Sequence, residues 1–129
     1  MNKTYLSIDY GTKKTGLAYS VGSFVFGYKT IPTNELSTHI EELIREKNIT
    51  DIVIGMPYNI DGSMSKHGKR VEQFAKELEK KTLLPIHLHD ERLTSSEARI
   101  TFDETGFDGD VDIESARLIL EDFLESEKK

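Results

Sequence analysis

Residues 5–19 read Tyr5-Leu6-Ser7-Ile8-Asp9-Tyr10-Gly11-Thr12-Lys13-Lys14-Thr15-Gly16-Leu17-Ala18-Tyr19, and this stretch decides the fold. Apolar residues alternate up to Asp9, which predicts a strand that ends in an acid. The glycines permit a tight turn and a close approach of the backbone to a phosphate or a metal-bound substrate. A carboxylate at the end of a core strand is costly to desolvate, so the pattern favours cation binding or catalysis. An exposed aspartate before a hairpin turn is the alternative.

The composition indicates one globular domain over residues 1–129. With 36% hydrophobic and 31% charged residues, 3 Pro and 9 Gly, the chain is neither linker-rich nor disordered. The absence of cysteine excludes disulfides and cysteine metal sites. A net charge of −6 argues against broad electrostatic binding to nucleic acid but allows a local basic surface.

The same sequence predicts a cytoplasmic protein. The first residues, Met1-Asn2-Lys3-Thr4, lack the apolar core of a signal peptide. No apolar run approaches the length of a membrane span, so we expect no association with a membrane.

Hydrophobic periodicity predicts the element order βββαβαβα, with a short additional helix after the capping box Thr94-Ser95-Ser96-Glu97. Short links make the first three strands an antiparallel meander, and right-handed crossovers add two parallel strands. The expected fold class is therefore α/β: a mixed five-stranded sheet in the order 3-2-1-4-5, with strand 2 antiparallel and helices on both faces. The expected strands cover residues 4–9, 15–20, 24–31, 51–56 and 86–90, and the last helix covers about 112–125.

Three parallel strands of this sheet would end at one edge, where open α/β sheets bind ligands. Strand 1 ends at Asp9, strand 4 runs into Asn59, and strand 5 runs into Asp90 and Glu91, which point to opposite sides. The last helix could bring Asp112 to the same edge. Three clustered carboxylates repel one another unless cations are bound, and oxygen ligands suit Mg²⁺ or Mn²⁺. Two such ions about 4 Å apart are the usual device for hydrolysing phosphodiesters.

Simpler roles exist for the same residues. Asp112 could be only a helix N-cap, and Asp90-Glu91-Arg92 could be a surface ion-pair cluster. His87 and His89 share a strand face, but without a third ligand in view we favour polar packing over metal binding.

Four motifs together resemble the YqgF/RuvX family over nearly the whole chain. They are Ile8–Ala18, the segment Ile54-Gly55-Met56-Pro57-Tyr58-Asn59-Ile60-Asp61-Gly62-Ser63, the segment His89-Asp90-Glu91-Arg92-Leu93-Thr94 with Glu97-Ala98, and Val111-Asp112 ahead of Leu118-Ile119-Leu120. The resemblance implies an RNase H-like fold related to RuvC Holliday-junction resolvases, and a nuclease of 5′ maturation of pre-16S rRNA. It implies Asp9, Glu91 and Asp112 as catalytic and metal-binding residues.

The residues that we expect to contact the substrate are mostly basic. Asn59 stands where resolvase relatives place an acid, and the basic run at residues 66–70 is either a phosphate contact or a solvated helix face. The predicted set is Lys13, Lys14, Asn59, Lys66, Lys69, Arg70 and Arg92. The segment Phe107-Asp108-Gly109-Asp110-Val111-Asp112 departs from the family, where it is often basic. This leaves open which of Asp108, Asp110 and Asp112 binds metal.

The leading hypothesis is a metal-dependent nuclease for structured RNA, with branched DNA as a possible substrate. Asp-x-Gly-Thr after a strand also occurs in ATP-binding domains of the actin, Hsp70 and sugar-kinase type, but these close ATP between two such domains and 129 residues supply one. A catalytically weak nucleic-acid-binding module is the third hypothesis. The sequence does not distinguish endonuclease from exonuclease action, or a monomer from a weak homodimer.

Overall fold

The computed structural model of the protein describes residues 3–91 and 111–128. Five strands and three α-helices make up this part of the chain. In chain order the elements are β1 (Tyr5–Asp9), β2 (Lys14–Val21), β3 (Phe24–Pro32), the 3-10 turn η1 (Thr33–Glu35), α1 (Leu36–Lys47), β4 (Asp51–Met56), α2 (Lys66–Thr82), β5 (Ile86–Asp90) and α4 (Val111–Glu127).

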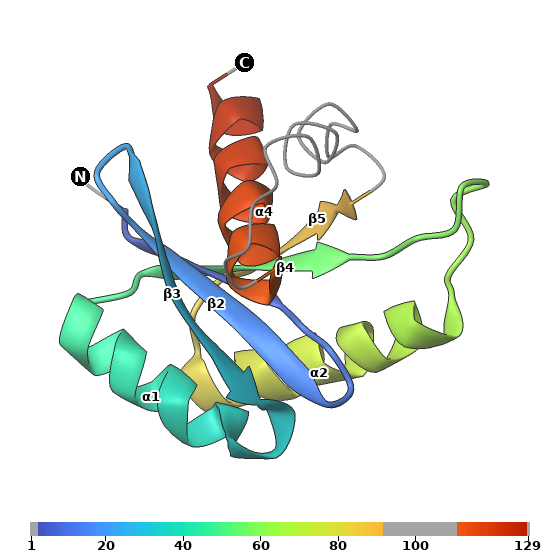
Figure 1. Ribbon diagram of the computed structural model, residues 1–129, viewed down its shortest axis with the longest axis horizontal. Helices are drawn as coiled ribbons and strands as arrows, with labels where there is room; N and C mark the ends of the chain where they lie inside the picture. Colours follow the sequence, from blue (N-terminus) through green and yellow to red (C-terminus); the bar gives the residue numbers. More distant parts are fainter. Residues whose placement is uncertain (1–2, 92–110, 129) are drawn as a thin grey trace.

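The strands form one mixed sheet in the order β3-β2-β1-β4-β5, which confirms the predicted topology (Figure 1). β2 is antiparallel to both β1 and β3, whereas β4 is parallel to β1 and β5. β1 is therefore the central strand, and β1, β4 and β5 end at the same edge.

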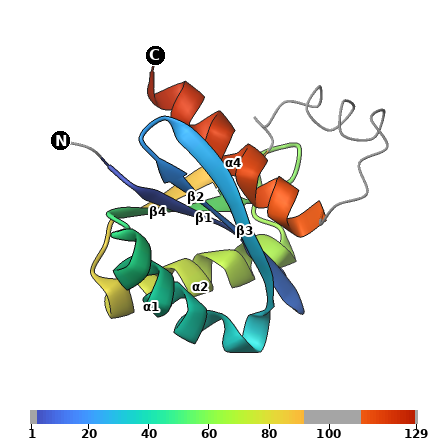
Figure 2. The same cartoon turned by 60° about the vertical axis from the view of Figure 1, so that its left-hand side comes forward.

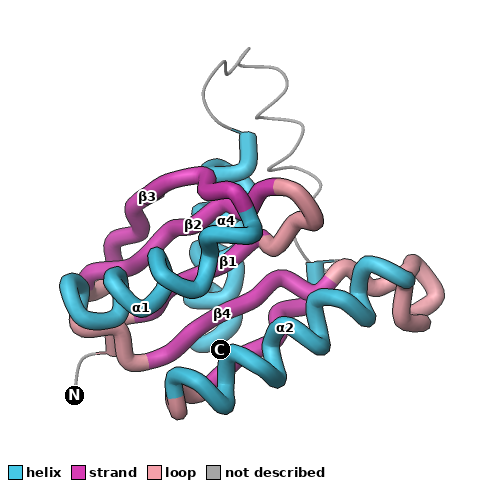
Figure 3. Tube along the Cα trace, turned by 90° about the horizontal axis from the view of Figure 1, so that it is seen from below, coloured by secondary structure: helices cyan, strands magenta, loops and turns pink. Residues whose placement is uncertain are grey.

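Helices cover both faces of the sheet. α1 and α2 lie on one face and α4 crosses the other (Figures 2 and 3). Leu6, Ile8 and Ile54 belong to the larger core under α1 and α2, whereas Val53 packs with Ile119, Leu120 and Phe123 of α4. All six residues of β4 are buried, as the continuous apolar run predicts for a strand covered on both faces.

Local signals explain where the helices begin and end. Ser65 caps α2, because its Oγ accepts a hydrogen bond from the Gly68 amide at 2.8 Å. α1 ends at Asn48, which adopts the left-handed conformation (φ 54°) that asparagine tolerates. No helix in residues 3–91 and 111–128 is long and apolar enough to cross a membrane.

Some boundaries differ from the prediction. β2 begins at Lys14 and ends at Val21, one residue longer at each end than expected. α4 begins at Val111, so Asp112 lies within its first turn rather than ahead of it as a cap. The predicted short helix after Thr94 and the acidic loop before α4 lie outside the described residues.

Candidate active site

Asp9 lies at the end of the central strand and faces α4. Two residues earlier on the same face, the buried Ser7 donates a hydrogen bond from Oγ to the Ala116 carbonyl of α4 at 2.7 Å. Side chains two apart in a strand point to the same side of the sheet. The carboxylate of the half-buried Asp9 is thus directed to the side that the N-terminal half of α4 covers.

A glycine on the neighbouring strand brings Asp112 to this position. Gly16 of β2 is the direct pairing partner of Asp9. A Cβ on Gly16 would lie 2.0 Å from the Asp112 carbonyl oxygen and 3.1 Å from the Asp112 Cβ. The first turn of α4 therefore rests directly on the backbone of β2, which only glycine permits. The ammonium of Lys14, at the start of β2, lies 3.2 Å from Asp112 Oδ2.

A second glycine makes room for Glu91 on the other side of Asp9. Gly55 follows Ile54, which pairs with Ile8, so β4 places Gly55 beside Asp9. A Cβ on Gly55 would lie 3.0 Å from the Glu91 Cδ and 3.1 Å from its Cγ. The Glu91 side chain thus lies over Gly55, on the face that α4 covers.

Asp112 and Glu91 therefore lie over the strands on either side of Asp9, at the same edge of the sheet. Their oxygen donors fit a hard divalent cation such as Mg²⁺ or Mn²⁺. As the side chains stand, no three His, Asp or Glu residues within 3–91 and 111–128 form a ready-made metal-binding group. Lys14 instead supplies the positive charge beside Asp112. Asp108, Asp110 and Arg92, which the sequence also nominates, lie outside the described residues.

The N-terminal half of α2 is joined to the strand end that carries Asp9. The Nε2–H of His67 donates to the Tyr10 carbonyl at 2.9 Å, since a carbonyl oxygen can only accept. The Tyr10 ring stacks against His67 (centroids 6.2 Å apart) and against Phe74 (4.4 Å). Sequence reasoning placed His67 in a basic run and missed this role, because no local pattern reports a contact between residues 57 positions apart.

Two of the predicted substrate-contacting residues lie beside Tyr10, which follows Asp9 in the chain. Lys69 and Arg70 line a shallow hollow of about 400 Å³ together with Tyr10, Gln73, Phe74 and Glu77. Lys13 and Lys66 are exposed.

Asn59 is held within its own loop. Its side-chain amide donates to Ser63 Oγ at 3.0 Å, its backbone N–H donates to the Ser63 carbonyl at 2.9 Å, and its carbonyl accepts from Gly62 at 2.8 Å. This loop, residues 57–65, extends away from the end of β4 (Figure 1).

The two histidines of β5 take part in polar packing, as predicted. His89 is buried, and its Nε2–H donates to Asp122 Oδ2 of α4 at 2.6 Å, which joins the strand before Glu91 to that helix. His87 donates to Asp51 Oδ2 at 2.9 Å at the opposite end of the sheet.

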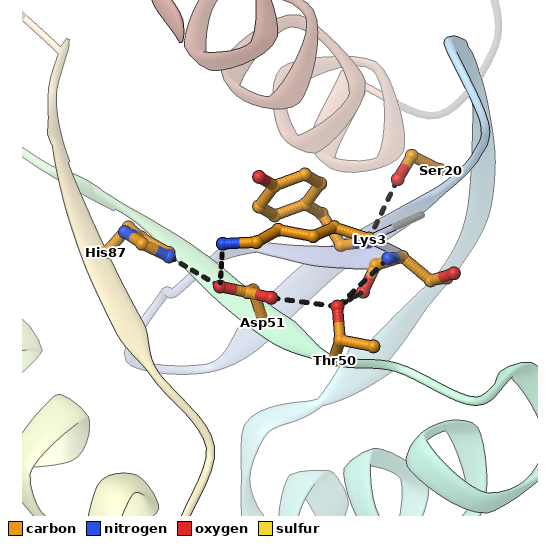
Figure 4. A network of polar contacts seen from close by, with 7 residues as sticks. Lys3, Ser20, Thr50, Asp51 and His87 are labelled. Atoms are coloured by element: carbon orange, nitrogen blue, oxygen red, sulfur yellow. Dashed lines mark hydrogen bonds and ion pairs between the residues drawn. The ribbon is translucent and has the colours of Figure 1, made fainter. Parts of the chain in front are cut away.

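Asp51 is the centre of the polar network at that far end (Figure 4). Its carboxylate accepts a hydrogen bond from Thr50 at 2.8 Å and lies 3.6 Å from the ammonium of Lys3. Burial acts to raise the pKa of Asp51, but the hydrogen bonds from His87 and Thr50 and the charge of Lys3 outweigh it, so the pKa lies below its usual value. Each charge is compensated, so this network stabilises the fold.

The chain is similar to known proteins over nearly its whole length. Residues 3–126 match the family model described as "RuvX: Holliday junction resolvase". The chain belongs to the RuvX family. Curated relatives include proteins named "Putative pre-16S rRNA nuclease" from Maridesulfovibrio salexigens (38% identical, covering 92% of this chain and 96% of the relative) and Lachnospira eligens (35%, covering 96% and 98%).

A solved structure shows the same fold. RuvC of T. thermophilus, in complex with a Holliday junction substrate, superposes with a TM-score of 0.65 and covers 93% of this chain and 91% of its own. The two sequences are 9% identical, so the likeness is one of fold. These comparisons confirm the family and the architecture that the four motifs predict. The chain is therefore a member of a nuclease family, which implies a nucleic-acid substrate.

Proposed function

We propose that this RuvX-family chain is a divalent-metal-dependent nuclease that cleaves the 5′ leader of pre-16S rRNA. The proposal is supported by the position of Asp112 over Gly16 and of Glu91 over Gly55, because these two glycines lie on the strands on either side of Asp9. The substrate comes from the names of the relatives, which match this chain over almost its full length.

Each acid has a distinct part in the proposed mechanism. Asp9 would hold a bound cation most rigidly, because it ends the central strand and has the least freedom to move. Glu91 and Asp112 complete the donor set from either side. When bound, divalent cations at this site would activate the attacking water and stabilise the leaving oxygen of the phosphodiester.

The basic residues supply binding rather than chemistry. Lys14 compensates the charge of Asp112, and would be available to the substrate when a cation takes over that role. Lys66, Lys69 and Arg70 at the start of α2 contact the phosphate backbone beside the site, and Lys13, Asn59 and Arg92 extend this surface.

Branched DNA is the second candidate substrate, because the family model is described by Holliday junction resolution and RuvC shares the fold. The deciding experiment incubates the purified chain with Mn²⁺ and three substrates: a pre-16S 5′ leader, an unstructured single-stranded RNA and a four-way DNA junction. We expect cleavage of the leader.

The matched pair of variants is Asp9→Asn and Glu41→Gln. Glu41 is an exposed acid on α1, so its variant controls for the loss of one negative charge. Asp9→Asn should abolish cleavage and weaken Mn²⁺ binding in calorimetry, while circular dichroism stays unchanged. Full cleavage by a well-folded Asp9→Asn protein would refute the mechanism. Substrate binding by the wild type without cleavage at any metal concentration would identify a binding module instead.

A further inference from the structure

Four aromatic rings gather on the β2–β3 hairpin, away from the candidate active site. Phe24 is 70% exposed and Phe26 is 45% exposed. The Tyr19 ring lies 5.6 Å from Phe26 and 6.2 Å from Tyr28, measured between centroids. We call Tyr19, Phe24, Phe26 and Tyr28 the aromatic face.

Strand register explains why these rings lie together. Tyr19 pairs with Phe26, and the ladder between β2 and β3 shifts by one residue between Leu17 and Ala18, opposite Tyr28. Phe24, Phe26 and Tyr28 alternate along β3 and so share one side of the sheet, which places Tyr28 beside Tyr19 as well. Val25, between Phe24 and Phe26, packs with the core under α4. The aromatic face therefore lies on the opposite side of the sheet, beside α1.

Two lysines lie next to the aromatic face, although the chain carries a net charge of −6. The Lys29 ammonium lies 5.3 Å from the centre of the Tyr28 ring, and the Lys47 ammonium of α1 lies 4.9 Å from that of Tyr19. Exposed rings next to cations fit a ligand with flat apolar surfaces and negative charges, and unpaired nucleotides have both.

We propose that the aromatic face binds an unpaired segment of the RNA substrate, with bases stacked on Phe24 and Phe26 and phosphates near Lys29 and Lys47. This inference rests on the proposed nuclease function and narrows its substrate to RNA with a single-stranded extension. Asp9 faces α4, whereas the aromatic face lies on the α1 side. An RNA that occupies both must bend around the edge strand β3. A flexible single strand can do so, but a stiff duplex with its bases paired cannot.

The test measures RNA binding without cleavage. In the full chain carrying Asp9→Asn, fluorescence anisotropy gives the Kd for a short unstructured RNA and for a duplex of the same sequence. The double variant Phe24→Ser/Phe26→Ser should raise the Kd for the single strand roughly tenfold or more, since each stacked base contributes about 1–3 kcal/mol. The Kd for the duplex should stay unchanged. Leu83→Ser is the matched control, because Leu83 is 86% exposed and lies at the end of α2.

Two results would overturn the proposal. One is an unchanged Kd for the single strand in a double variant whose circular dichroism matches the parent. The other is a wild type that light scattering shows to be a dimer and a double variant that it shows to be a monomer, with the same affinity for RNA. This result would make the aromatic face a protein interface. Cleavage by the wild-type chain is scored separately. A chain that binds single strands through Phe24 and Phe26 but never cleaves would refute the nuclease proposal and leave the aromatic face as an RNA-binding site.

Discussion

Adding one methyl group at Gly16 should move Asp112 away from the other acids of the candidate site. In Gly16→Ala the new Cβ would lie 2.0 Å from the Asp112 carbonyl oxygen and 2.4 Å from its carbon, whereas ordinary contacts begin at 3.4 Å. The atoms in the way are backbone, so they cannot rotate aside. The first turn of α4 must move by more than 1 Å, and Asp112 moves with it.

The size of the effect follows from this overlap. Overpacking against a rigid neighbour costs about 3 kcal/mol, the upper end of the usual range. An unfolding entropy of about 2.1 cal/mol/K per residue gives roughly 0.27 kcal/mol/K for 129 residues, so the melting temperature should fall by about 11 °C. Displacement of a catalytic group by about 1 Å should lower the cleavage rate on the order of a hundredfold.

The assay combines thermal unfolding by circular dichroism with Mn²⁺-dependent cleavage at a temperature where every variant is folded. Gly22→Ala is the matched control, because nothing lies within 4 Å of its added Cβ while its φ of +61° still strains alanine. Gly22→Ala should lower the free energy of unfolding by about 1 kcal/mol and leave the cleavage rate unchanged. A Gly16→Ala protein that cleaves at the wild-type rate and melts within a degree or two of it would show that α4 does not position Asp112 through this contact.

Three further predictions concern other parts of the molecule. The folded-state pKa of Asp51 is depressed, so its contribution to stability is present above the unfolded value of 3.8 and is lost as pH falls through the lower folded value. In urea unfolding, the difference in free energy of unfolding between wild type and Asp51→Asn should therefore shrink as pH falls through that range. A difference that does not change with pH would contradict this prediction. His67→Leu removes the donor to the Tyr10 carbonyl, so it should lower the free energy of unfolding by about 1 kcal/mol and reduce the cleavage rate. His67→Gln keeps an N–H donor and should retain most of the stability and most of the cleavage rate. Equal losses in the two variants would mean that the hydrogen bond does not matter. Neutralising Lys66, Lys69 and Arg70 together should reduce the slope of log Kd against log salt concentration by about 2, at roughly 0.7 per single-strand phosphate. The same change at Lys76, Lys80 and Lys81, farther along α2, should leave the slope unaltered. Identical slopes for the two triple variants would make the first set a solvated helix face.

Local patterns in the sequence were enough to predict the architecture. Alternation up to Asp9, the Gly-Thr turn and the continuous apolar run at Asp51–Met56 define strands through interactions between near neighbours in the chain. Once the strand order is known, chirality and short connections leave few topologies, and the observed order β3-β2-β1-β4-β5 is the one expected. The nomination of Asp9, Glu91 and Asp112 rests on strand ends and motif resemblance and stays a prediction, which is consistent with Asp112 over Gly16 and Glu91 over Gly55.

Contacts between residues far apart in the chain could be seen only in the tertiary structure. The sequence predicts that Gly16 allows a close approach to the backbone, and only packing shows that Asp112 makes this approach and that Glu91 lies over Gly55. His67 joins α2 to the strand end at Tyr10, and the register of β2 against β3 places Tyr19 next to Phe26 and Tyr28. Strand register and helix docking determine these contacts, and both depend on how the whole core packs, which no stretch of neighbouring residues encodes by itself.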